Sequence, residues 1–157
     1  MSDRFAGAWR LLSAEYQRQG QTVGYPFGPH PVGLLMYDGA NHMSAQIMQP
    51  NRAALADSRA KQRAVVEGRA AFDGYLGYYG TYELQPDGRT IIHHLIGSSL
   101  PHWVGTEQVR RYEFAADRLT LSAQATTDDA GAVAVLVWER IRPCRPDGQG
   151  EDPAQIS

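Results

Sequence analysis

The chain has 157 residues, of which 43% are hydrophobic and 20% charged, and a formal net charge of −2 at pH 7. This length and composition are typical of one globular domain with a sizeable core. The small net charge and the lack of a basic stripe argue against a nucleic-acid-binding protein, and no window approaches the roughly 18 apolar residues of a membrane span.

Two features bear on the compartment. Residues 1–5 contain no apolar run, so we expect no signal peptide and a cytoplasmic protein. Cys144 is the single cysteine, which excludes an internal disulfide and suits a reducing compartment.

The first predicted strand covers residues 7–17, where Trp9 and Glu15 share one face. A loop with three prolines follows at residues 24–31 and holds Tyr25 and Phe27 in an extended segment. These two aromatic residues either pack into a small hydrophobic cluster or border the mouth of a cavity.

The next segments predict a hairpin and a helix. Residues 33–37 and 42–49 read as two strands around a turn at 38–41. Apolar residues recur at helical spacing from residue 57 to about residue 79, with a break near Gly74. A helix inserted into a series of antiparallel strands would lie over an open end, as a candidate lid.

The remaining strands form regular hairpins. Strands are predicted at residues 80–85 and 89–98, at 108–114 and 118–123, and at 132–141, and a disordered polar tail at 143–157. We therefore expect one all-β domain over residues 5–142. Its architecture is an eight-stranded up-and-down antiparallel barrel with one helix inserted after the third strand.

The first and last strands of such a barrel are neighbours. Arg140 can then lie over the indole of Trp9 and plug one end, which leaves a cup open at the other. Leu136, Trp138 and Arg140 share one face of the last strand, but the opposite face is also apolar. An apolar outer face indicates that another element or a second subunit covers it, and in the second case the protein would be a homodimer.

Alternation along the strands predicts which residues face the interior. A turn that pairs Tyr82 with Ile92 puts Tyr82 and His94 inside and His93 outside, and a shift by one residue would exchange the two histidines. On the following strand, Arg110 lies inside with Tyr112 and Phe114. The predicted ligand-binding residues are aromatic: Tyr25, Phe27, Tyr79, Tyr82, Trp103, Tyr112 and Phe114. Trp103 is either a core plug or an aromatic wall at the mouth.

Glu15, His94 and Arg110 are the polar groups of this predicted interior, and two interpretations stay open. In the structural one, Glu15 pairs with Arg110 and His94 bonds to a tyrosine, because a buried charge needs a partner. In the functional one, Arg110 binds an anionic ligand and His94 moves a proton, so that the three form a catalytic set.

Other chemistries find little support in the sequence. Adjacent strand residues point to opposite faces, so His93 and His94 cannot share one metal ion. The chain has no G-x-S-x-G motif and no phosphate-binding glycine loop. We expect neither metal nor cofactor.

Several separated blocks resemble the bacterial and fungal lipocalin-like domain family, over roughly residues 5–142. They are Trp9-Arg10-Leu11 with Ser13 and Glu15, residues 25–29, Gly39 with residues 42–44, residues 79–82, His93-His94, residues 103–106, residues 108–111 and residues 138–140. The resemblance implies an eight-stranded calycin-type barrel with a helix after the third strand, and small-molecule binding without a defined reaction.

Three hypotheses follow. The first is a barrel that binds a small, largely hydrophobic molecule, and the second is a cofactor-independent isomerase, dehydratase or cyclase acting on a polyketide-like or aromatic metabolite. The third is an interaction protein whose interior is filled by its own side chains.

Overall fold

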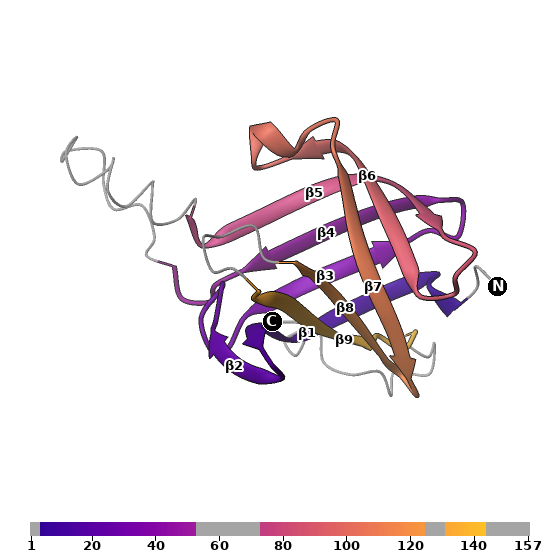
Figure 1. The fold of residues 1–157 in the computed structure, drawn as a ribbon. Helices are drawn as coiled ribbons and strands as arrows, with labels where there is room; N and C mark the ends of the chain where they lie inside the picture. Colours follow the sequence, from indigo (N-terminus) through magenta and orange to yellow (C-terminus); the bar gives the residue numbers. More distant parts are fainter. Residues whose placement is uncertain (1–3, 53–72, 125–130, 144–157) are drawn as a thin grey trace, which may run out of the picture.

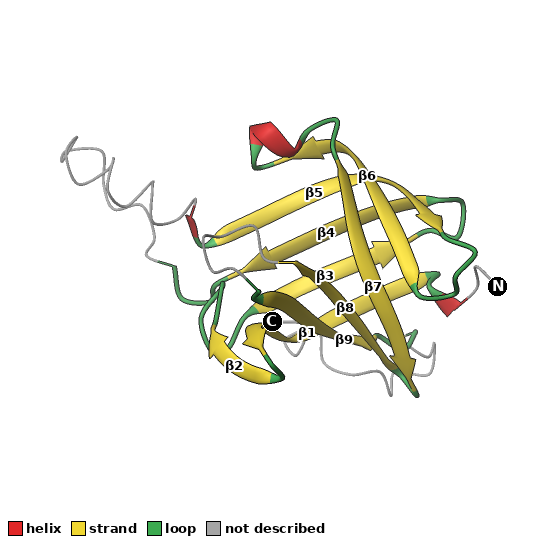
Figure 2. Ribbon diagram, viewed as in Figure 1, coloured by secondary structure: helices red, strands yellow, loops and turns green. Residues whose placement is uncertain are grey.

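The computed structural model describes residues 4–52, 73–124 and 131–143. Their strands are β1 (Gly7–Arg18), β2 (Gln21–Gly24), β3 (Val32–Tyr37), β4 (His42–Met48), β5 (Tyr75–Leu84), β6 (Thr90–Ser98), β7 (Glu107–Ala115), β8 (Arg118–Gln124) and β9 (Val133–Arg140). A short 3-10 helix, η2 (Pro101–Trp103), connects β6 to β7. Figure 2 shows that strands dominate the described chain.

The strands follow one another in an antiparallel sheet that closes into a barrel (Figure 1). The sheet order is β2-β1-β3-β4-β5-β6-β7-β8-β9, and β1 also pairs with β9. Since β2 pairs only with the end of β1, the closed barrel consists of β1 and β3 to β9. The predicted all-β barrel is therefore confirmed, and β2 is an addition that the sequence did not predict.

The predicted helix of residues 57–79 is corrected at its end. Residues 75–79 belong to β5, which pairs with β4 from Met48 and Tyr75 onward. The predicted pattern joined Leu76 and Tyr79, whose spacing of three residues suits a helix. In β5 these two residues lie on opposite faces, since Leu76 lines the interior and Tyr79 is 55% exposed. Residues 57–72 of that helix, and residues 144–157 of the predicted tail, lie outside the described residues.

Arg140 and Trp9 close one end of the barrel as predicted. The Arg140 guanidinium lies 4.1 Å from the centre of the Trp9 ring. Its Nη1 donates to the Ala6 carbonyl at 2.8 Å, and its Nη2 donates to the Arg4 carbonyl. The bound N-terminal segment inserts Phe5, which packs edge-on against Tyr37, Tyr112 and Phe114. These contacts fill this end with aromatic side chains.

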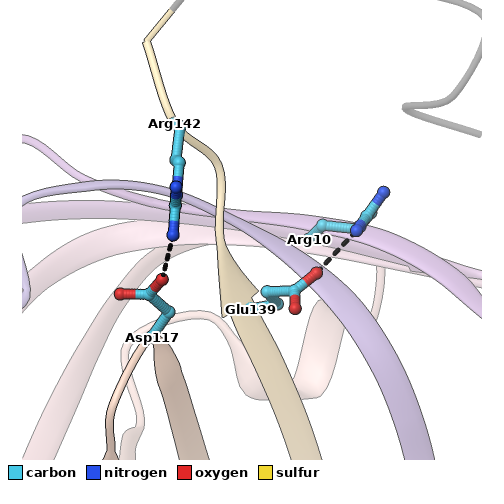
Figure 3. Close-up of polar contacts among 4 residues, drawn as sticks. All are labelled: Arg10, Asp117, Glu139 and Arg142. Carbon is cyan, nitrogen blue, oxygen red and sulfur yellow. Dashed lines mark hydrogen bonds and ion pairs between the residues drawn. The ribbon is translucent and has the colours of Figure 1, made fainter. Parts of the chain in front are cut away.

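The β1–β9 junction also carries a polar contact on the outside (Figure 3). Arg10 and Glu139 are opposite each other in the register, and their side chains form an ion pair of 2.6 Å. Nearby, Arg142 pairs with Asp117 at 2.9 Å. Opposite charges at facing positions favour this strand pairing over a shifted one.

Among the described residues, no helix is long and apolar enough to cross a membrane. No group of three or more histidine, cysteine, aspartate and glutamate side chains is arranged to hold a metal ion in this part of the chain.

Candidate functional site

A cavity of about 350 Å³ opens at the end of the barrel opposite the Trp9 plug. Because this space is empty of described protein atoms, the interior is not completely filled, contrary to the premise of the third hypothesis. Its lining residues lie in six strands (β1, β4, β5, β7, β8 and β9), in the 25–31 loop and in η2, and outside these elements at Asp73 and Leu100. The full set is Tyr16, Pro26, Phe27, Ile47, Asp73, Tyr75, Leu76, Tyr78, Leu100, Trp103, Gln108, Arg110, Leu121, Ala123, Gln124, Ala134, Leu136 and Trp138.

Side-chain size along β8 and β9 explains where the cavity lies. At its level the two strands place Ala123 opposite Ala134. One step toward the closed end Leu121 faces Leu136, and a further step brings Leu119 opposite Trp138. The small alanines leave space that the larger pairs fill below them.

Arg110 projects into this cavity from β7, as the alternation of that strand predicted. Its Nη2 lies 3.4 Å from Oε1 of Gln108, and its Nη1 donates to the Val109 carbonyl at 3.2 Å. None of the ion pairs within the described ranges involves Arg110. The cavity thus contains a cation whose partners are neutral.

Tyr78 lies beside both Arg110 and the buried His93. Its ring packs against Trp103, with centroids 5.9 Å apart, and lies 6.1 Å from the ring of His93. Burial raises the pKa of the Tyr78 phenol, while the charge and hydrogen bonding of Arg110 oppose that rise. The phenol is therefore neutral at ordinary pH.

His93 is fully buried, and His94 lies on the outside, which reverses the predicted orientation of the two histidines. Tyr82 pairs with His93 rather than with Ile92. The turn at residues 86–89 contains four residues, closed by a bond from the Gln85 amide to the Thr90 carbonyl. One residue more in the turn than predicted shifts the register by one and exchanges the two faces.

Each histidine has partners on its own side. Nε2 of His93 is 2.9 Å from the Tyr37 phenol oxygen, and burial, aided by the charges of Arg110 and His94, lowers the pKa of His93 to about 3. His94 lies between two exposed carboxylates, 3.5 Å from Glu83 and 3.3 Å from Glu107. His94 therefore contacts acidic groups on the surface and has no access to the cavity.

Glu15 is also outside the barrel, contrary to the prediction. A β-bulge between Leu11 and Ser13 shifts the alternation of β1, so Ala14 and Tyr16 face inward instead. Glu15 accepts hydrogen bonds from Thr22 at 2.7 Å and Gln17 at 3.2 Å, and these bonds lower the pKa of its carboxyl. The structural alternative, a Glu15–Arg110 pair, is therefore wrong as well.

The predicted catalytic set is not assembled in one place. Of its three residues only Arg110 lines the cavity, while Glu15 and His94 lie on the outer surface. Joint acid–base chemistry by the three on a molecule inside the barrel is incompatible with this arrangement.

The predicted ligand-binding aromatics divide into three groups. Phe27 and Trp103 line the cavity, and both also pack against the buried core. Tyr82, Tyr112 and Phe114 face inward but pack around Phe5 at the closed end. Tyr25 and Tyr79 are directed to solvent, with exposed fractions of 50% and 55%.

The predicted ligand-binding set omitted four aromatic residues that line the cavity: Tyr16, Tyr75, Tyr78 and Trp138. Tyr78 has the same parity along β5 as Tyr82, so the alternation that placed Tyr82 inside also indicates Tyr78. Tyr16 carried no such signal, because the bulge that turns it inward is invisible in the alternation pattern.

Comparison with known proteins shows the family of this chain, and a lipocalin-like protein is among the similar solved structures. A family model described as a lipocalin-like domain matches residues 6–141. A crystal structure of a lipocalin-like protein from Bacteroides uniformis matches with 15% sequence identity and a TM-score of 0.44, over 85% of this chain and 96% of that chain. No curated protein matches this chain.

Proposed function

The chain belongs to the lipocalin-like domain family, and on that premise we propose that it binds a small, largely hydrophobic molecule in the cavity at the open end of its barrel. The observation that carries the proposal is the cavity itself. Its volume of about 350 Å³ lies at the lower end of the range of about 300–1,000 Å³ that small-molecule sites occupy.

The lining suits an apolar body. Phe27 and Trp103 supply aromatic lining, and Leu121, Leu136 and Trp138 supply further apolar side chains. Removing apolar surface from water contributes roughly 25 cal/mol per Å², so contact with these side chains favours a hydrophobic ligand. The aromatic rings additionally favour flat or ring-containing molecules.

A neutral fluorescent probe tests this function. N-phenyl-1-naphthylamine, whose emission rises in apolar surroundings, should bind saturably with one molecule per chain. The same titration with excess unlabelled hydrophobic competitor should return the emission to its free value. Emission that rises without saturation, or not at all, would contradict a defined cavity site.

A further inference from the structure

We propose that the molecule bound in the cavity carries a carboxylate, which Arg110 binds through its guanidinium group. This inference rests on the proposed binding function and adds the chemical class of the ligand. It predicts an amphipathic monoanion, with an apolar body along the aromatic wall and the acid group at β7.

The first argument is the electrostatic state of Arg110. It is the one cation among the described residues that line the cavity, and no carboxylate in the described ranges forms an ion pair with it. A charge in a mostly apolar cavity is costly unless it is paired. A ligand carboxylate would offset this cost with a charge-assisted, two-pronged hydrogen bond that fits the planar guanidinium.

The second argument is that the buried titratable groups near Arg110 inside the barrel are neutral. Tyr37, Tyr78 and His93 are all uncharged near neutral pH, because burial disfavours their ionised forms. Asp73 also lines the cavity and has interactions of its own. The three buried groups therefore do not compensate the positive charge of Arg110, and this charge attracts an anionic group.

The size and charge of the site select a carboxylate over a phosphate. A phosphate monoester carries a charge of about −1.5 to −2 near neutral pH and usually engages several cationic or backbone donors. This cavity supplies one guanidinium among its described lining residues. One positive charge balances one carboxylate.

A matched pair of probes tests the inference. 2-Naphthoate and 2-naphthamide have the same rings and nearly the same shape, but only the first is charged at neutral pH. Wild-type protein should bind 2-naphthoate at least about tenfold more tightly than 2-naphthamide, measured by calorimetry. Arg110→Met and Arg110→Gln should both abolish that preference while still binding the amide.

Arg111 provides the control, because it follows Arg110 on β7 but is exposed on the opposite face. Arg111→Met changes the same charge and should leave the tenfold preference intact. Equal binding of the two probes to wild type would overturn the inference alone, and so would a preference that survives in both Arg110 variants. Failure of both probes to bind saturably would overturn both the inference and the proposed function.

Discussion

The phenol oxygen of Tyr37 lies 2.9 Å from Nε2 of His93, and both side chains are buried inside the barrel. The pair connects β3 with β6 across the interior, between the aromatic plug and the cavity. Nδ1 of His93 has no hydrogen-bond partner within the described residues. A protonated imidazole would therefore bring a second donor and a full charge into a site that offers no acceptor for them.

The first prediction is that acid destabilises the fold through His93. Its pKa is about 3 when folded and about 6.5 when unfolded, so the unfolded chain binds the extra proton between those values. The free energy of unfolding should fall as pH decreases through this window, by about 2 kcal/mol between pH 7 and pH 5. Urea unfolding followed by tryptophan fluorescence measures it.

Substitutions separate His93 from other titrating groups. In His93→Gln, the amide can replace Nε2 beside Tyr37. The free energy of unfolding of this variant should therefore change much less between pH 7 and pH 5 than that of wild type. His94→Gln changes the neighbouring histidine on the surface and should keep the pH dependence of wild type. The lowered pKa values of the Glu15, Asp38 and Asp87 carboxyls place their contributions at lower pH. An identical slope in wild type and His93→Gln would contradict the assignment.

The second prediction concerns the plug. Arg140 combines a cation–π contact with Trp9 and hydrogen bonds to two carbonyls of the N-terminal segment. Arg140→Leu should lower the free energy of unfolding by about 2–3 kcal/mol, because it removes the contact and leaves the carbonyls without their donor. Arg142→Leu removes an exposed ion pair with Asp117 and should cost less than about 1 kcal/mol. Equal losses in the two variants would contradict a special role for Arg140.

Patterns that repeat along the chain made the fold predictable. Turn residues and alternating strands gave the barrel, and the residues at the two ends of the chain gave the Trp9–Arg140 plug. The short β2 was missed because its four residues are too few to show alternation. The helical spacing misled at Leu76 and Tyr79, because apolar residues on the two opposite faces of β5 happen to be separated by about one helical turn.

The site was less predictable because it depends on single-residue register. One additional residue in the turn before β6 exchanged His93 with His94, and one bulge in β1 exchanged Glu15 with Tyr16. Both errors moved polar side chains across the sheet, since a shift by one residue reverses a strand's faces. Arg110 was assigned correctly because β7 has neither a bulge nor an uncertain turn between Gln108 and Phe114.

The third prediction follows from those corrected positions. Glu15→Gln and His94→Gln change side chains that contact the outer surface, so neither should alter the affinity for N-phenyl-1-naphthylamine or 2-naphthoate by more than about twofold. Titrations of both variants beside wild type measure this. A large loss in either would mean that these residues affect the cavity in a way that their outward placement does not explain.

The fourth prediction tests the cavity by filling it. Ala134 faces Ala123 on β8 and Tyr16 on β1, at the level where the barrel is empty. Ala134→Leu places three additional carbons in that space, so binding of N-phenyl-1-naphthylamine should weaken at least about tenfold. Because the added atoms enter existing space rather than a packed core, the free energy of unfolding should change by less than about 1.5 kcal/mol.

Ala115→Leu is the matched control for this substitution. Ala115 is exposed at the end of β7, so the same increase in size there should leave probe binding unchanged. Ala123→Leu fills the cavity from the neighbouring strand and should reproduce the loss seen with Ala134→Leu. Wild-type affinity in both cavity-filling variants, with folding verified by circular dichroism, would place the binding site elsewhere. Weaker binding in these two variants and not in Ala115→Leu assigns the probe to the space between Arg110, Tyr78 and the two alanines.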